Sequence, residues 1–209
     1  MTLESSKNLG GIGAILLVIG MLAFLGAPYA GVIGLIGIIL LLIGTKGMAD
    51  HYTEGGIFNN ALYGFIMIII GGVAFITVLI MTVISAIAQL GVTDWTEWTT
   101  RIQQNAIDFT TLWNLVGPIV GGFAVALIVL FICAVIASIL YRKSLSSLAK
   151  KSGVGMFETA GLLMLIGAVL TIVLVGFILI WIAFILVAVA FFSIKTTPTQ
   201  PPPTTPPPS

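Results

Sequence analysis

Charged residues are scarce in this chain of 209 residues. Eight basic and seven acidic side chains make up 7% of the sequence, against about 25% in ordinary soluble domains. So few charges cannot cover the surface of a water-soluble monomer, and a net charge of +1 provides no basic patch for nucleic acid. The composition therefore excludes a soluble monomer, a disordered chain and a nucleic-acid-binding protein of the basic-patch kind.

Histidine and cysteine are nearly absent, since the chain has one of each, His51 and Cys133. An intrachain disulfide is therefore impossible. The one His–carboxylate cluster, formed by Asp50, His51 and Glu54, is more typical of a solvated loop than of a metal site. We also find no Ser-His-Asp set and no glycine-rich phosphate loop. The sequence predicts no enzymatic activity, no catalytic residue, no cofactor and no metal.

Apolar residues are abundant, at 59% of the chain. A membrane-spanning helix needs about 20 mostly apolar residues, and the sequence contains six segments of this kind. Their approximate bounds are 9–27, 30–44, 61–90, 115–140, 159–175 and 177–194. The predicted fold class is an all-α integral membrane protein, with six transmembrane helices in three hairpins within residues 1–195.

The connections between these spans differ in polarity. A turn at Gly26–Ala30 joins the first pair, and Thr45–Asn60 is predicted to be a polar loop. Pro118 is expected in the first turn of the fourth span, where proline is tolerated. None of the six spans contains Asp, Glu, Lys, Arg or His. Because proton-coupled transport usually needs titratable groups within the membrane, redox and proton-coupled roles are disfavoured.

Residues 159–194 are too long for one span and contain no polar break. Residues 13–20 resemble residues 160–167, and this alignment places a turn of the last pair at Gly176. One tilted span is the alternative, and it would put the tail, residues 196–209, on the opposite side of the membrane as a glycosylated stalk. The tail contains only Thr, Pro, Gln and Ser, so we expect it to be disordered.

The segment between the third and fourth spans has helical periodicity. Trp95, Trp98 and Trp113 fall on one face of an amphipathic helix predicted over residues 94–113. Tryptophan favours the headgroup level of a bilayer. We expect this helix to lie along the membrane surface, with the three tryptophans as interfacial anchors.

The basic residues are distributed unequally. In a six-span topology, one side of the membrane receives all but Arg101: Lys7, Lys46, Arg142, Lys143, Lys150, Lys151 and Lys195. The positive-inside rule then predicts a multi-pass protein of the cell membrane with both termini in the cytoplasm. Arg142, Lys143, Lys150 and Lys151 are also candidate contacts for anionic lipid headgroups.

A polar face on the third span is a second candidate site. Thr82, Ser85 and Gln89 follow at spacings of three and four, so they lie on one side of a helix. They could line a path for a neutral solute or an ion. Hydrogen bonding between helices is the more common use of such residues in membranes.

Glycines recur at helix-packing spacings. Gly117 and Gly121 form a GxxxG pair in the fourth span, and Gly71 and Gly72 interrupt the third. Small residues let helix backbones approach closely in a membrane. A flexible or broken helix is the alternative for Gly71 and Gly72, and packing is favoured.

The two ends of the membrane region carry a family resemblance. The opening, residues 3–13, and the closing pattern of Phe157-x-Thr159-Ala160-Gly161 through Gly167 to Ala190-Phe191-Phe192 resemble a family of small, mostly archaeal multi-pass membrane proteins. That family is known as a domain of unknown function. The resemblance covers almost all of the chain except the tail. It implies a membrane fold and an archaeal source, and it brings no activity, cofactor or catalytic residue.

Three functions remain, in order of preference. The first is an accessory or scaffold subunit, packing with itself as a homo-oligomer or with a membrane-protein partner. The second is a channel or facilitator for a small neutral solute or ion. The third is a lipid-interacting protein. In each case the lipid bilayer is an expected partner.

Overall fold

The computed structural model describes residues 2–23, 30–89, 109–173 and 175–195, and these residues form helices without a β-strand. The elements in chain order are α1 (Leu3–Ala23), α2 (Ala30–His51), α3 (Gly55–Gln89), α5 (Phe109–Ser152), α6 (Met156–Leu170), the 3-10 helix η1 (Thr171–Val173) and α7 (Val175–Phe192). Six helices in these ranges are long and apolar enough to cross a membrane. This confirms the predicted all-α class and the presence of two helices within residues 159–194.

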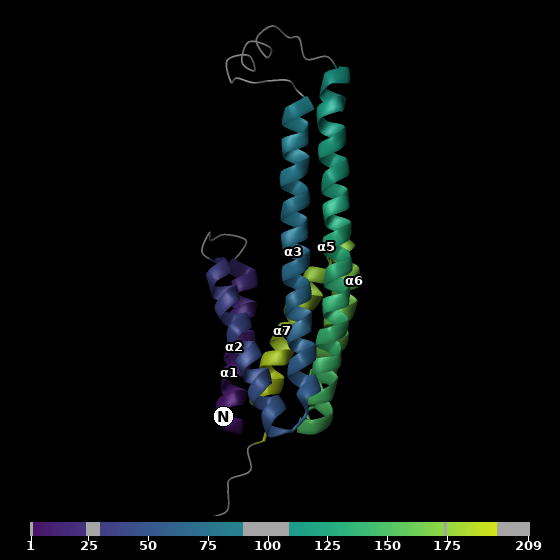
Figure 1. The fold of residues 1–209 in the computed structure, drawn as a ribbon. Coiled ribbons are helices and arrows are strands. Elements are labelled where there is room, and N and C mark those ends of the chain that lie inside the picture. Colours follow the sequence, from purple (N-terminus) through teal and green to yellow (C-terminus); the bar gives the residue numbers. More distant parts are fainter. Residues whose placement is uncertain (1, 24–29, 90–108, 174, 196–209) are drawn as a thin grey trace, which may run out of the picture.

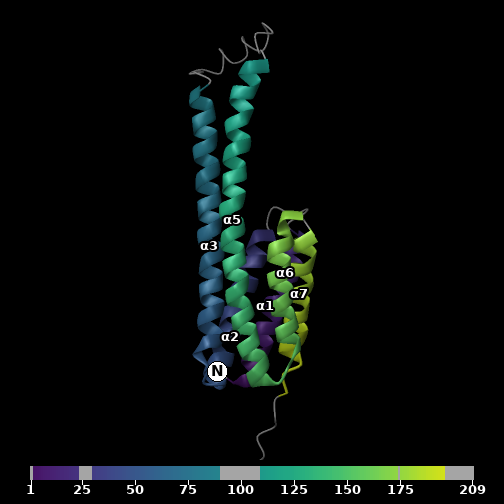
Figure 2. The same cartoon turned by 90° about the vertical axis from the view of Figure 1, so that its right-hand side faces the viewer.

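The helices differ strongly in length (Figures 1 and 2). At about 1.5 Å per residue, α3 with 35 residues is about 52 Å long and α5 with 44 residues about 66 Å. The other four helices have 15 to 22 residues and are about 22 to 33 Å long. Each of the six helices starts or finishes at one common end of the molecule, which we call the basal end. At the opposite, distal end, α3 and α5 continue alone.

Each helix packs most extensively against a neighbour in the chain. The main contacts are α1 with α2, α3 with α5 and α6 with α7. Smaller contacts between α5 and α6, α1 and α7, and α2 and α3 join these pairs. The first and last helices therefore lie side by side. The arrangement of the pairs as three hairpins in a membrane stays a prediction.

A hydrophobic core lies at the basal end, where all six helices meet. Met48, Ile57, Leu148, Phe157 and Phe191 are fully buried in it, and they come from five different helices. The rings of Phe157 and Phe191 meet edge to face, with centroids 5.1 Å apart. Such large buried side chains are the main source of packing energy in a core.

This core explains why the predicted polar loop over Thr45–Asn60 is wrong. α2 continues to His51 and α3 begins at Gly55, so only three residues connect them. Met48 and Ile57, within the expected loop, are both buried in the basal core. Asp50 and His51 are still helical, so the break is confined to residues 52–54. Burial of Met48 and Ile57 favours helix on both sides of this short turn.

Two other boundaries differ from expectation. α5 begins at Phe109, so Pro118 lies inside the helix and not in its first turn. The break in the last pair falls at η1, and Gly176 lies in the first turn of α7. Residues 90–108 and 196–209, which include most of the predicted interfacial helix and the tail, lie outside the described residues.

Glycines set the distance between α1 and α2. A Cβ atom added at Gly13 would come within 2.7 Å of the Gly37 carbonyl oxygen and would also meet the backbone nitrogen of Leu41. A Cβ added at Gly44 would likewise meet the backbone of Gly10. Backbone atoms cannot move aside as a flexible side chain can. The two helices therefore pack this closely because these positions lack side chains.

The variant Gly13→Ala is expected to lower the free energy of unfolding by about 1 to 3 kcal/mol, because the methyl group overpacks the α1–α2 contact. Titration of the detergent-solubilised protein with SDS measures this change. Gly31→Ala is the matched control in α2, since a Cβ there meets nothing within 4 Å. An equal loss in both variants would contradict the role assigned to Gly13.

Candidate functional site

The structure places two residues of the candidate polar path, Thr82 and Ser85, in different surroundings. The hydroxyl group of Thr82 donates a hydrogen bond to the Val78 carbonyl oxygen, 2.8 Å away, and the side chain packs against Gly122 of α5. Ser85 is exposed. The side chain of Gln89 lies outside the described set. Thr82 thus occupies a helix contact, whereas Ser85 faces away from the protein.

Of the paired glycines in α3, one is packed. A Cβ atom at Gly71 would lie 2.6 Å from the Cβ of Cys133 on α5, whereas a Cβ at Gly72 would meet nothing within 4 Å. α3 passes through both positions without a break. The packing interpretation is confirmed for Gly71, and Gly72 lies on an open face.

Trp113, one of the candidate interfacial anchors, and the four candidate lipid contacts lie at opposite ends of α5. Trp113, with 64% of its surface exposed, lies in the distal part of the helix, while Trp95 and Trp98 lie outside the described residues. The four basic residues are exposed near the basal end: Arg142, Lys143, Lys150 and Lys151. Within the described residues, this end of the molecule carries all of the charged side chains.

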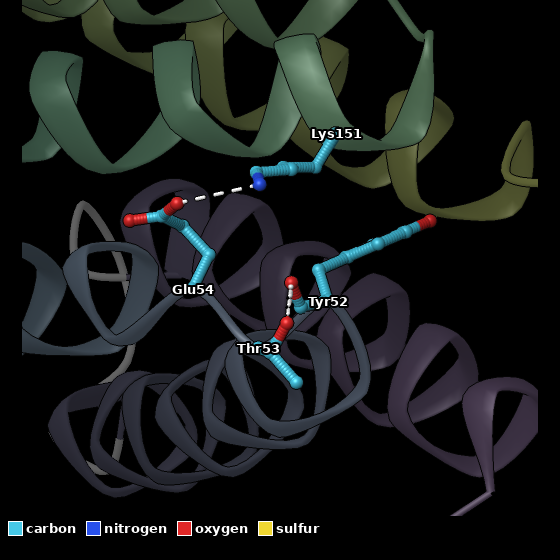
Figure 3. A network of polar contacts seen from close by, with 4 residues as sticks. All are labelled: Tyr52, Thr53, Glu54 and Lys151. Atoms are coloured by element: carbon cyan, nitrogen blue, oxygen red, sulfur yellow. Dashed lines mark hydrogen bonds and ion pairs between the residues drawn. The ribbon is translucent and has the colours of Figure 1, made fainter.

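The basal connection between α2 and α3 forms a small polar network (Figure 3). Glu54 makes an ion pair with Lys151 of α5, with 3.5 Å between Oε2 and Nζ. Thr53 has a positive φ of 50°, and its hydroxyl donates to the Tyr52 carbonyl oxygen at 2.8 Å. Burial raises the pKa of the Tyr52 hydroxyl above its ordinary value, so this group stays neutral at physiological pH.

Through its ion pair with Lys151, Glu54 links the connection between α2 and α3 to α5. Within the described ranges, no three His, Cys, Asp or Glu side chains come together as a metal site. The ring of His51 stacks edge to face on Tyr52, with centroids 5.1 Å apart. An exposed ion pair of this kind adds about 0 to 1 kcal/mol to stability, so its main effect is to position the connection.

Two structural contacts were not anticipated from the sequence. Lys7 Nζ donates a hydrogen bond to the Ile194 carbonyl oxygen at 2.9 Å, just beyond the end of α7. Trp181 Nε1 of α7 donates to the Val18 carbonyl oxygen of α1 at 3.2 Å. A cation near a helix C-terminus is favourable, because the free carbonyl groups there carry partial negative charge. Nothing in the local sequence signals either contact, since the partners are more than 160 residues apart.

Comparison with known proteins gives a family and no activity. A family model described as "Protein of unknown function (DUF996)" matches residues 33–185. An uncharacterized protein of Methanocaldococcus jannaschii is 29% identical over 195 residues, which cover 93% of this chain and 94% of that protein. No solved structure matches the chain.

Proposed function

We propose that this chain, which belongs to the DUF996 family of proteins of unknown function, is a non-enzymatic accessory or scaffold subunit of the cell membrane. In this role it packs with a second copy of itself or with another membrane protein. The family description and the name of the archaeal relative give no reaction. The six apolar helices of the described residues support a membrane protein.

One observation carries the proposal: α3 and α5 each have glycines on two faces, and among the described residues only one of these faces contacts another helix. Gly71 and Gly122 pack against the partner helix of the pair. At Gly72, Gly117 and Gly121 an added Cβ would meet nothing within 4 Å. Small residues at exposed positions of apolar helices favour close packing with another helix. The α3–α5 pair therefore offers an unused packing surface.

The polar side chains of the long helices support the same interpretation. The hydroxyl groups of Thr77, Thr82 and Ser138 each donate to a carbonyl oxygen three or four residues earlier in their own helix. These groups are satisfied locally, so they impose no requirement for a solvated path. This favours a packing role over the alternative of a channel.

The distribution of charge supports the proposed orientation. Among the described residues, the basic side chains lie at the basal end, together with both ends of the described chain. By the positive-inside rule, we propose that this end faces the cytoplasm.

Gly121→Leu is expected to abolish association while leaving the monomer folded, because leucine fills the open glycine face at a position where an added Cβ meets nothing within 4 Å. Gentle extraction of the tagged protein, followed by mass spectrometry of proteins that remain bound in near-equal amounts, measures association with itself or a partner. Val120→Leu is the matched control on a neighbouring, 60% exposed position. Absence of any stoichiometric partner or second copy for the unsubstituted protein would refute the proposal.

A further inference from the structure

The two long helices extend far beyond the other four. α3 and α6 both start at the basal end, and α3 has 20 residues more, which corresponds to about 30 Å. Even α2 is 13 residues shorter than α3, or about 20 Å. The hydrocarbon layer of a bilayer is itself about 30 Å thick. One flat layer therefore cannot match both sets of helices.

The outward surface of the extending part of the α3–α5 pair is mainly apolar, although the hydroxyl side chains of Thr77 and Ser85 on α3 are also exposed. On α3, Ile80, Met81, Val83 and Ile84 are each at least half exposed. On α5, five apolar residues at about the same level are 38% to 60% exposed: Val116, Ile119, Val120, Phe123 and Val125. A protein partner covers one face of a helix pair, whereas hydrocarbon covers all of them. Such a surface indicates that lipid surrounds the distal part of both helices.

The turns of the short pairs are apolar as well. Ile172 and Val173 in η1 are 72% and 64% exposed. The connection formed by residues 24–29 contains no charged residue in the sequence. The longer connection between α3 and α5 carries Asp94, Glu97, Arg101 and Asp108. The chain thus supplies charges to the long connection and none to the two short ones.

The backbone at η1 suits an apolar environment. Thr171 Oγ1 donates to the Gly167 carbonyl oxygen at 2.9 Å, and η1 continues the helical hydrogen bonding of α6 by one turn. Gly176 packs against Gly167, so the two helices meet directly after the turn. Irregular backbone is costly in hydrocarbon unless its polar groups are paired. The helical bonding of η1 reduces this cost over residues 171–173.

From these observations we infer that α3 and α5 alone cross the whole bilayer. The pairs α1–α2 and α6–α7 are re-entrant helical hairpins, which enter from the basal side and turn back within the hydrocarbon. Lipid acyl chains of the distal leaflet cover η1 and those exposed sides of α3 and α5 against which no partner helix packs. Tilting does not remove the mismatch, because α5 and α6 pack side by side and tilt together. The inference does not rest on the proposed packing role.

A depth measurement tests this inference in the full chain. In a Cys133→Ala background, which keeps the Cβ atom that contacts Gly71, a nitroxide spin label is attached at Ile172→Cys. The reconstituted protein is then exposed to oxygen, which concentrates in hydrocarbon, and to a water-soluble nickel chelate. Ile136→Cys is the matched control, since it lies on the exposed side of α5 at a similar height above the basal end. Thr110→Cys, exposed near the start of α5, is the reference for the distal surface.

The expected oxygen-to-nickel collision ratio at position 172 equals that at 136 and is several-fold higher than that at 110. A ratio at 172 equal to the ratio at 110 would show that the hairpin reaches the distal surface, and would overturn the inference. Shielding of position 172 from both reagents would also overturn it, because the turn would then be buried in protein. Val173→Cys repeats the test if the first variant does not fold.

Discussion

Gly176→Ala is expected to be among the most destabilising single substitutions in the chain, at about 3 kcal/mol, and to separate α7 from α6. An added Cβ atom would meet the Gly167 carbonyl oxygen and the Thr171 backbone nitrogen, and would lie 2.6 Å from the Leu170 carbonyl carbon. All three are backbone atoms, so no change of rotamer relieves the overlap. The cost therefore lies at the upper end of what overpacking produces in well-packed interiors.

SDS titration of the detergent-solubilised protein measures the loss in the free energy of unfolding. Gly155→Ala is the matched control just before α6, because a Cβ there meets nothing within 4 Å. If Gly176→Ala unfolds at the same SDS fraction as the unsubstituted protein, the close approach of the two helices is not required for stability.

Phe191→Ala is expected to lower the free energy of unfolding by about 3 to 5 kcal/mol, the usual cost of removing a fully buried aromatic ring. Phe191 is completely buried in the basal core, touches Phe157 edge to face, and lies where a Cβ added at Gly10 would overlap it. Removal of this ring leaves a cavity between α1, α6 and α7. The same titration measures the loss.

The neighbouring Phe192 provides the control for this prediction. Phe192 is 43% exposed, so Phe192→Ala removes a ring of the same size with much less loss of packing. The double variant Phe157→Ala/Phe191→Ala should lose less than the sum of the single variants, because each single substitution already breaks the ring contact. Equal losses for Phe191→Ala and Phe192→Ala would show that the basal core does not dominate stability.

The class of the fold was predictable from the sequence because apolar runs about 20 residues long have few other structures open to them. The residues at which helices end in the basal core were not predictable from the sequence. Met48 and Ile57 belong to short apolar pairs, with Ala49 and Phe58, in a polar segment. Their burial depends on Leu148, Phe157 and Phe191, which are distant in the sequence. Local polarity alone therefore predicted a loop where the chain is helical.

The candidate sites were likewise predictable from the sequence only in part. Glycine spacing predicted helix packing, and Gly71 confirms it. Which glycines contact a neighbouring helix depends on how each helix is rotated about its axis. This rotation places Gly122 against Thr82 and leaves Gly117 and Gly121 open. Gly176 was predicted as a turn from the alignment of residues 13–20 with residues 160–167, yet its role is to let two backbones touch.

The contact between the first and last helices has a consequence for synthesis of the chain. Ile194, whose carbonyl oxygen accepts the hydrogen bond from Lys7, is among the last described residues, and Phe191 fills the space beside Gly10. A growing chain makes α1 before α7 and cannot cover α1 until residues 175–192 have left the ribosome. α1 and α2 must therefore persist as a partly finished intermediate while α3 to α6 are made, held by their own glycine contacts. Closure of the basal core thus waits for the synthesis of α7.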